Sequence, residues 1–599
     1  MAELKPIVLC LSRSGQEVAT RVAKALDAPL HGREGRVDQA DVFFPNALDH
    51  IRMLFQAGYP VIGVCAAGIL IRAVAPVLAD KRVEPPVIAI PDDGSTVIPL
   101  LGGHRGANRL AKQIADILQS HAAVTTAGDV ALGLALDEPP LGWRLANPED
   151  AKNAMAAMLS GEQPIIEGEN IWGLEGGAGP LRLIATEAPS STDNALIYHP
   201  QRHVLGLGCA RGCDPAEMWK LVQDCLAIAG IAPESVACVT SLDLKGDEPA
   251  MIETARLLGV PFRIFDAETL EAEAPRLANP SDVVFTEVGC HGVAEGSALA
   301  AAAGGAVLCV EKRKTANATC AIARAPDVIV EMAGRSRGKL SIVSIGPGQH
   351  SWRTPEASQL IAEAEELVGY GLYIDLLGPL AAGKIRSDFP LGGEEDRCRY
   401  ALEEAGKGKN VALICSGDAG IYAMGALVYE LLDRGADALG VSDAAKRVEV
   451  ISTPGVSALQ GAAARAGAPL GHDFCAISLS DLLTPREDII KRLKAAAEGD
   501  FVIAFYNPVS KRRRTLLAEA RDILLQHRPD DTPVMLASSL GRPEEHIRYR
   551  KLVDLEVDEV DMLTVVLVGS SHSKLAQLGE GPRMYTPRGY ARKIDGDLS

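Results

Sequence analysis

The sequence predicts a multi-domain α/β protein, and three observations lead to this prediction. At 599 residues the chain is long enough for roughly four domains of about 150 residues each. Short Val/Ile-rich strands alternate with Ala-rich helical stretches along its whole length. Only 4% of the residues are aromatic, so the cores must be built from Ala, Val, Leu and Ile.

The N-terminal part opens with apolar strands that alternate with helical stretches. The predicted strands are Ile7–Leu11, Val61–Val64 and Val87–Ile90, and a helix is predicted over Arg109–Leu118. Pro and Gly clusters over about residues 138–198 indicate a small intervening module, and a further α/β unit opens at Val204–Gly208 and closes near Glu331. The polar, glycine-bearing segment 334–339 is the clearest boundary. The predicted domains are residues 1–137, 138–200, 201–333, 339–450 and 451–580.

Beyond that boundary, apolar strands break into loops of small or polar residues. These strands are Ser341–Ile345, Val411–Cys415, Val448–Ser452, Phe501–Phe505 and Leu563–Val568. In open α/β sheets, ligands bind outside the carboxyl ends of the strands. Glycines at several of these ends, such as Gly346 and Gly417, let a backbone approach a ligand closely. The pattern therefore predicts one small-molecule site at these strand ends, including the end at Gly569-Ser570.

Charge and composition argue against several classes of function. A formal charge of −18 disfavours a nucleic-acid binder and docking on an anionic membrane. No secretory signal is expected, and the longest apolar stretch, Ala298–Val310, is shorter than the roughly 20 residues of a membrane span. The twelve cysteines contain no CxxC pair, which predicts reduced thiols and a cytoplasmic protein without a structural metal.

Gly417-Asp418-Ala419-Gly420 lies between a strand and a predicted helix over Tyr422–Leu432. The carboxylate of Asp418 suits either ribose hydroxyls or a backbone amide cap. A plain turn with an Asp at the helix start is the alternative interpretation. No P-loop lysine follows any of the loops.

Two further stretches carry charged or proton-transferring side chains. The basic run 511–514 follows the Tyr506-Asn507-Pro508 turn and suggests an anionic substrate; a solvated helical turn is the alternative. Residues 470–485 include His472 beside Asp473, which could act as base and acid near neutral pH. Read from composition alone, a strand followed by a capped helix start explains this stretch better.

Residues 339–580 resemble the tetrapyrrole (corrin/porphyrin) methyltransferases. The matching motifs are Gly346-Pro347-Gly348, Gly417-Asp418 and Pro454-Gly455-Val456-Ser457-Ala458. The resemblance implies a class III S-adenosylmethionine (SAM) enzyme with two α/β domains, usually a homodimer. Within the family, residues 416–422, 472–485, 506–508 and 510–513 are similar to the ring-contracting precorrin-3B C-17 methyltransferases. Ala419 departs from the Asp-Pro of many family members.

The resemblance also implies residue roles. The SAM pocket would be lined by Pro347, Gly417, Asp418, Ile421, Tyr422, Ser457, Ala458, Tyr506 and Ala537. Asp481 or His472 would be the base that takes a proton from the C-20 hydroxyl during ring contraction. Lys511, Arg512 and Arg513 would bind the carboxylates of the tetrapyrrole.

Residues 1–330 resemble the cobalt-precorrin-5A hydrolase family, which opens a δ-lactone and releases a two-carbon fragment. The matching stretches are Ile98–Asn108, Gly206–Cys209, Ser241–Lys245 and Asn317–Thr319 with Ala321–Ala323. The three N-terminal domains then correspond to the N-terminal, middle and C-terminal modules of that family. The residues implied for this site are His104, Asn108, Arg211 and Glu295, and Asp92-Asp93 could add a carboxylate. Ala210-Arg211 and Gly292–Glu295 depart from the usual family motifs.

We therefore expect a fused corrin-pathway enzyme that methylates C-17 of precorrin-3B, with ring contraction to precorrin-4, in cobalamin biosynthesis. The alternative is a cobalt-containing substrate, cobalt-factor III of the anaerobic route. The N-terminal part would then be an active hydrolase or a noncatalytic corrinoid carrier. The expected partners are the polycarboxylate substrate, a second copy of the chain and other corrin-pathway enzymes.

Overall fold

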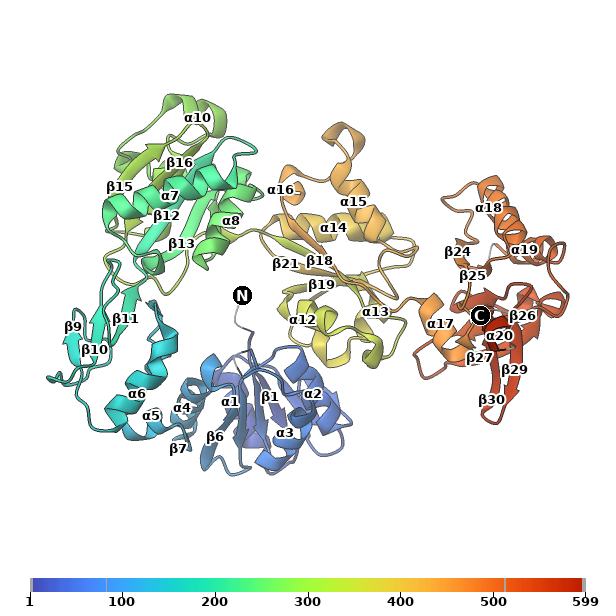
Figure 1. Ribbon diagram of the computed structural model, residues 1–599, viewed down its shortest axis with the longest axis horizontal. Coiled ribbons are helices and arrows are strands. Elements are labelled where there is room, and N and C mark those ends of the chain that lie inside the picture. Colours follow the sequence, from blue (N-terminus) through green and yellow to red (C-terminus); the bar gives the residue numbers. More distant parts are fainter. Residues whose placement is uncertain (1–3, 82, 511–512, 595–599) are drawn as a thin grey trace. The chain divides into compact units, whose positions relative to one another are not determined.

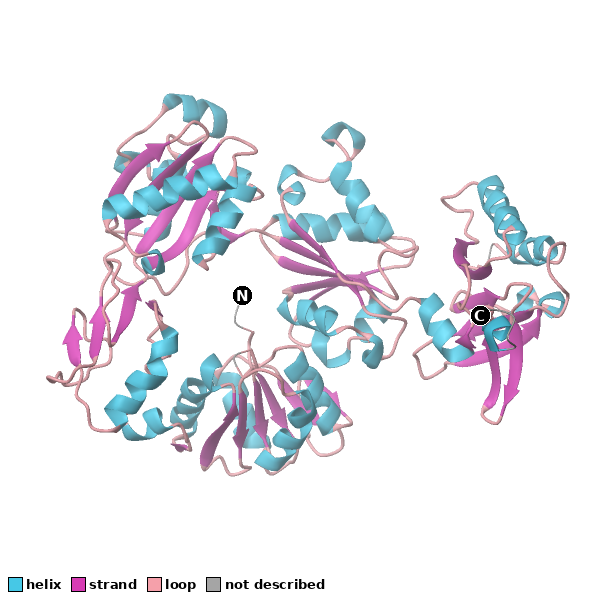
Figure 2. Ribbon diagram, viewed as in Figure 1, coloured by secondary structure: helices cyan, strands magenta, loops and turns pink. Residues whose placement is uncertain are grey.

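The structure is a computed structural model that describes residues 4–81, 83–510 and 513–594 (Figure 1). Helices and strands alternate throughout, which confirms the predicted α/β class (Figure 2). Two compact units are present: Met1–Leu340 with Tyr400–Val411 and Arg434–Val450, and Ser341–Arg399 with Ala412–Asp433 and Ile451–Ser599. Among the described residues, no helix combines the length and the apolar character needed to cross a bilayer.

The first sheet has the strand order β3-β2-β1-β4-β5-β6-β7. Its strands are β1 (Ile7–Cys10), β2 (Leu30–Arg33), β3 (Val42–Phe44), β4 (Val61–Val64), β5 (Val87–Ile90), β6 (Thr96–Leu101) and β7 (His121–Ala122). Helices α1 (Gln16–Ala25) and α4 (Ala107–Leu118) pack together, as do α2 (Ala47–Gln56) and α3 (Ala67–Val74) (Figure 1). Strands β1, β4 and β5 are parallel and completely buried, which explains their continuous apolar runs.

Two further sheets complete the N-terminal part. The second has the order β8-β11-β10-β9, and the third β15-β16-β12-β13-β14-β17. Their strands are β8 (Trp143–Leu145), β9 (Ile165–Glu167), β10 (Arg182–Ala185), β11 (Ala195–Pro200), β12 (His203–Cys209), β13 (Val236–Leu242), β14 (Phe262–Phe265), β15 (Val307–Lys314), β16 (Ala318–Arg324) and β17 (Arg335–Ser336). The helices are α5 (Ala127–Ala131), α6 (Ala151–Leu159), α7 (Pro215–Ala229), α8 (Pro249–Leu258), α9 (Ala267–Ala272), α10 (Asp282–Val288) and α11 (Val293–Ala302).

The segment predicted as a boundary, residues 334–339, is more ordered than a linker. Arg335 and Ser336 form β17 and pair with β14. Just beyond them, Arg337 donates hydrogen bonds to the carbonyls of Arg447 (2.8 Å) and Val448 (3.1 Å). These bonds join Arg337 to Arg434–Val450, a later segment of the same unit.

The sheet that starts after β17 has the order β20-β19-β21-β18-β22. Its elements are β18 (Lys339–Ser344), α12 (Pro355–Glu363), β19 (Glu366–Tyr370), α13 (Gly371–Asp375), β20 (Ile385–Phe389), α14 (Glu394–Gly406), β21 (Asn410–Cys415), α15 (Gly425–Asp433), α16 (Asp443–Lys446) and β22 (Glu449–Ser452). Strands β18 and β21 run parallel, since Lys339 bonds to Lys409 at one end and Ile345 to Cys415 at the other.

The last two sheets have the orders β24-β25-β28-β26-β27 and β23-β30-β29. Their elements are α17 (Ala458–Ala466), β23 (Gly467–Ala468), β24 (Phe474–Ser478), α18 (Arg486–Glu498), β25 (Val502–Tyr506), α19 (Leu516–Leu524), β26 (Pro533–Ser538), β27 (His546–Lys551), β28 (Thr564–Val568), β29 (Lys574–Leu578), β30 (Gly581–Tyr585) and α20 (Tyr590–Ile594).

Two predictions about the chain beyond residue 339 are wrong. Strand β28 is antiparallel to β25, with Ile503 opposite Val568, so Gly569-Ser570 lies at the amino end of β25. Gly569-Ser570 therefore cannot share a crevice with the Tyr506 turn at the carboxyl end. The helix predicted from Tyr422 begins at Gly425, because Tyr422 has a left-handed backbone (φ 52°) that a right-handed helix excludes.

Candidate functional site

Three loops at the carboxyl ends of β18, β21 and β22 are bonded to one another; we call residues 346–348, 416–420 and 453–458 the strand-end loops. Gly346 and Gly417 exchange two backbone hydrogen bonds, of 3.2 Å and 2.8 Å. Both glycines have left-handed backbones (φ 74° and 71°). A side chain at either position would be strained, which accounts for the two glycines.

Ser344, the last residue of β18, joins the second loop to the third. Its hydroxyl donates to the Thr453 carbonyl (2.6 Å) and accepts the Ala419 N–H (2.9 Å). Its own N–H donates to the Thr453 hydroxyl (3.0 Å). Both side chains are buried, so these bonds fix the two loops without competition from water.

The carboxylate of Asp418 makes a second connection between the same loops. Oδ1 accepts the Gly420 N–H at 2.8 Å, and Oδ2 accepts the Gly455 N–H at 2.9 Å. Of the two roles considered for this carboxylate, the structure shows the backbone amide cap. Asp418 therefore shapes the loops through their backbone.

The glycines of these loops differ in how much space surrounds them. A Cβ at Gly455 would lie 2.3 Å from the Gly417 oxygen and 2.6 Å from the Ser344 Cβ. At Gly417 the nearest atom to such a Cβ is the Ser457 Cα, at 3.8 Å. Gly455 is thus packed tightly against the neighbouring loop and strand, whereas Gly417 is less tightly surrounded.

Two neighbouring tyrosines lie beside the strand-end loops: Tyr506 bonds to the third loop, and Tyr422 follows the second. The Tyr506 hydroxyl donates to the Ser457 hydroxyl (3.0 Å) and accepts the Leu459 N–H (2.9 Å). Burial raises the pKa of Tyr506, so its hydroxyl stays protonated. Tyr422 donates to the Ala476 carbonyl (2.7 Å), and its ring centroid lies 5.3 Å from that of Tyr506.

The other residues predicted to line the methyl-donor pocket lie in different surroundings. Pro347 is buried, and its carbonyl accepts a hydrogen bond from Arg542 (3.3 Å). Ile421 is half-buried, and Ala458 opens α17. Ala537 is a residue of β26 and is fully buried in an apolar core, so its methyl group faces other core side chains.

The structure separates the two candidate bases. His472 precedes β24 and Asp481 follows it, so they lie at opposite ends of that strand. Asp481 is on the side of the Tyr506 turn, because Leu479 bonds to the Tyr506 carbonyl. Asp481 Oδ1 lies 3.9 Å from Nε of Arg513, which brings a predicted base and a predicted substrate ligand together. Lys511 and Arg512 lie outside the described residues.

In the first sheet, the Gly-rich turn with His104 and Asn108 lies at the amino end of the parallel strands. Strand β6 is antiparallel to β5, and a Cβ at Gly102 would lie 2.6 Å from Pro86, just before β5. Asp92-Asp93 is at the opposite end of β5. The suggestion that Asp92-Asp93 adds a carboxylate to this turn is therefore wrong. Asn108 donates to Thr126 (3.0 Å); the His104 side chain lies outside the described part.

Arg211 and Glu295 are both occupied by protein partners. Arg211 pairs with Asp247 (2.6 Å) and with the buried Glu248 (3.2 Å). Glu295 is 1% exposed and accepts four hydrogen bonds, from the N–H groups of Ala278, Asn279 and Lys312 and from the Asn279 amide. Burial opposes its ionisation, but these donors outweigh burial and lower its pKa.

Sequence reasoning missed one feature of these sites. The roles of Ser344 and Thr453 went unnoticed, because their hydrogen bonds join positions 109 residues apart in the sequence. In the third sheet region, Nδ1 of His291 lies 2.8 Å from the Glu271 carboxylate, and its ring stacks on Phe285. Among the described residues, no three His, Cys, Asp or Glu side chains are grouped so that they could hold a metal ion.

Comparison with known proteins defines the class to which this fold belongs. A model of the tetrapyrrole (corrin/porphyrin) methylases matches residues 339–556. Models of the cobalamin synthesis G N-terminal and C-terminal regions match residues 49–129 and 203–323. The chain belongs to the tetrapyrrole methylase family, and its N-terminal part carries cobalamin synthesis G regions. Both resemblances seen in the sequence are thus confirmed, and the family assignment makes the chain a SAM-dependent methyltransferase.

Individual relatives are similar to the C-terminal part. The precorrin-3B C(17)-methyltransferase of Sinorhizobium sp is 43% identical over 42% of this chain and 98% of its own length. The probable cobalt-factor III C(17)-methyltransferase of Salmonella typhimurium is 45% identical over 42% of this chain and 99% of its own. Among solved structures, the methyltransferase CobJ is 38% identical, covering 42% of this chain and 100% of CobJ, with a TM-score of 0.39.

Proposed function

We propose that the chain transfers a methyl group from SAM to C-17 of precorrin-3B, with contraction of the macrocycle to precorrin-4. The support is the similarity to relatives named for this methylation over almost their entire length. The proposal extends to cobalt-factor III, because relatives named for either substrate match to a similar degree. It includes a homodimer that works in the cytoplasm alongside other corrin-pathway enzymes.

The observation that carries the proposal is the bonding of the three strand-end loops through Ser344 and Asp418. On its side-chain face, Gly417 has the Ser457 Cα as its nearest neighbour, at 3.8 Å from the position of an added Cβ. Gly417, Pro347, Ile421 and Ser457 would hold the donor at these loops. SAM supplies a methyl group already activated on a sulfonium, so the protein mainly has to orient donor and acceptor.

Aromatic side chains fit a cationic donor at this place. The rings of Tyr422 and Tyr506 are adjacent, and aromatic faces stabilise cations. The Tyr422 hydroxyl ties its loop to β24, and the Tyr506 hydroxyl ties β25 to the start of α17. The two tyrosines therefore link both parts of the methylase region around the strand-end loops.

Ring contraction also needs a base for the proton of the C-20 hydroxyl, and we assign this role to Asp481. Asp481 lies at the end of β24 that adjoins the Tyr506 turn, whereas His472 lies at the other end. Its neighbour Arg513 is suited to bind a substrate carboxylate.

A turnover experiment tests the proposed function. The full chain is incubated with SAM and precorrin-3B, and in parallel with cobalt-factor III, and products are followed by mass and absorption spectrum. The proposal predicts one added methyl and the spectrum of a contracted ring with at least one substrate. Folded protein that adds no methyl to either substrate would refute it.

For the N-terminal part we propose a corrinoid-binding role without hydrolysis. The supporting observation is that Arg211 and Glu295, two residues implied for a hydrolytic site, are occupied by protein partners. With the δ-lactone intermediate, the full chain should form a coloured complex and release no acetaldehyde. Acetaldehyde formation with turnover would instead establish a hydrolase.

A further inference from the structure

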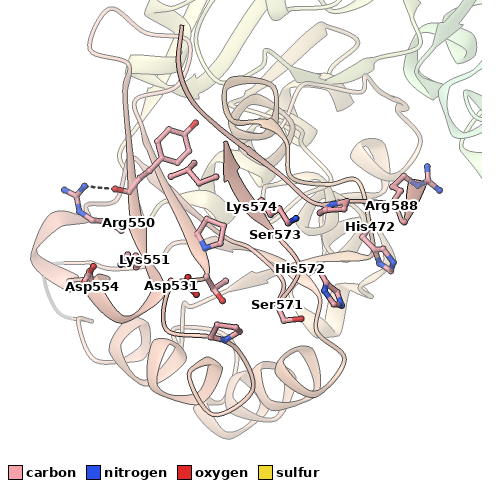
Figure 3. Close-up of a pocket in the computed structure, with 17 residues that line it drawn as sticks. His472, Asp531, Arg550, Lys551, Asp554, Ser571, His572, Ser573, Lys574 and Arg588 are labelled. Atoms are coloured by element: carbon pink, nitrogen blue, oxygen red, sulfur yellow. Dashed lines mark hydrogen bonds between the residues drawn. The ribbon is translucent and has the colours of Figure 1, made fainter. Parts of the chain in front are cut away.

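A large cavity lies beside the hairpin formed by β29 and β30, away from the strand-end loops. Its volume is about 1280 Å³. It is lined by His472, Pro529, Asp531, Thr532, Pro533, Tyr549, Arg550, Lys551, Asp554, Ser571, His572, Ser573, Lys574, Leu575, Pro587, Arg588 and Gly589 (Figure 3). His472 marks its position at the amino end of β24, the end opposite to Asp481. The proposed methyl-transfer site does not use this cavity.

The charge of the lining is unusual for so acidic a chain. Lys551, Lys574 and Arg588 line the cavity and have no ion pair within the described ranges, in a chain of formal charge −18. A fourth cation, Arg550, is paired with Glu559 (2.5 Å). The lining also contains two carboxylates, Asp531 and Asp554, so the cations are in excess.

The positions of the cations indicate the kind of ligand. Arg550 and Lys551 lie on one side of the cavity, Arg588 lies on the opposite side, and Lys574 lies between them (Figure 3). Cations that converge on one point suit a single phosphate, whereas cations spread around a large cavity suit a ligand with several separated anionic groups. The volume is ample for a ligand larger than a typical drug molecule.

We propose that this cavity is a second anion-binding site, and that it holds a tetrapyrrole through its peripheral carboxylates. The volume of the cavity and its excess of cations indicate a large polyanion as the ligand. The choice of a tetrapyrrole rests on the proposed function. A site of this kind would retain a polycarboxylate close to the enzyme, either before methyl transfer or after it.

Titration of the full chain with uroporphyrin, an octacarboxylate tetrapyrrole, tests the proposal. We expect two molecules per chain, one in the methyl-transfer site and one in the cavity. The double variant Lys574→Glu with Arg588→Glu should weaken one of the two sites about tenfold or more and leave methyl transfer at saturating substrate unchanged. Lys494→Glu, an exposed lysine of α18 outside the cavity, is the matched control.

The outcomes separate this proposal from the proposed function. If the double variant binds uroporphyrin like the unmodified chain, the cavity is not a tetrapyrrole site and the inference fails. If tripolyphosphate displaces the cavity-bound uroporphyrin at equal concentration, the ligand is a polyphosphate, and the tetrapyrrole assignment fails. Loss of one site in the double variant supports the inference even in protein that shows no methyl transfer.

Discussion

The carboxylate of Asp418 accepts the backbone N–H of Gly455 at 2.9 Å, which connects loops that are 37 residues apart in the sequence. The other oxygen of the same carboxylate accepts the Gly420 N–H. A charged acceptor with two backbone donors is stronger than a neutral one. The shape of the proposed donor site therefore depends on a residue whose side chain is turned towards the protein.

Replacing Asp418 by Asn should weaken binding of the donor. The Asn side chain has one acceptor oxygen, so one of the two backbone N–H groups loses its partner, at a cost of about 1–3 kcal/mol. We expect a roughly tenfold or larger rise in the dissociation constant for S-adenosylhomocysteine, measured by calorimetry. Asp433→Asn, at the exposed end of α15, should bind like the unmodified chain. Equal affinity in the Asp418 variant would show that this contact does not shape the site.

Replacing Gly455 by Ala should displace the strand-end loops. The new Cβ would lie 2.3 Å from the Gly417 oxygen, a distance that only a backbone shift can relieve. We expect methyl transfer to fall by at least tenfold, together with a lower thermal midpoint. The control is Gly579→Ala, where nothing lies within 4 Å of the added methyl group. A Gly455→Ala enzyme of normal rate would contradict the packing described here.

Asp481→Asn tests the assignment of the ring-contraction base. An amide cannot take up the C-20 hydroxyl proton, so formation of the contracted product should slow by about 100-fold or more. Binding of the methyl donor should be unchanged, because Asp481 is not part of the strand-end loops. The matched variant His472→Gln should contract the ring at the normal rate. A normal rate in Asp481→Asn would exclude this carboxylate as the base.

The first sheet contains a buried pair of histidines that makes its stability depend on pH. Nδ1 of His31 lies 3.0 Å from Nε2 of His50, and the His50 ring stacks on Phe44. Burial lowers the pKa of His31 to about 4 and that of His50 to about 3. Both rings are therefore neutral in the folded protein at neutral pH.

Because both folded-state pKa values lie below the usual 6.5, the unfolded chain binds more protons as the pH falls. Stability is thus greatest above pH 6.5 and decreases towards pH 4, by roughly 2 kcal/mol per histidine at pH 5. Hydrogen exchange of peptides that span residues 7–33, corrected for intrinsic rates, should show this loss. His50→Gln should reduce it by about half, and His121→Gln, an exposed control, should not. Equal protection at pH 7 and pH 5 would contradict the buried pair.

The sequence was sufficient to predict the α/β class and most strand positions, because buried parallel strands such as Val61–Val64 and Val87–Ile90 are continuous apolar runs between turn signals. Strand direction was not readable in the same way. Strand β28 is antiparallel to β25, so Gly569-Ser570 lies at the opposite end from the Tyr506 turn. Strand β6 is antiparallel to β5, so His104 and Asp92 lie at opposite ends of β5.

For the candidate site, the glycines and Asp418 could be predicted because short motifs identify them. The roles of Ser344 and Thr453 depend on hydrogen bonds across 109 residues of sequence, which no local pattern encodes. Glu295 is a related case: its motif suggested a site, but four donors on residues 16 or 17 positions away make it a buried structural acceptor.

Calorimetric titration of the full chain with S-adenosylhomocysteine tests the central claim most directly, namely that the strand-end loops hold a SAM-type donor. We predict saturable binding of one molecule per chain, weakened in Asp418→Asn and in Gly455→Ala but not in Gly579→Ala. If the unmodified chain is folded and does not bind S-adenosylhomocysteine, the claim is contradicted.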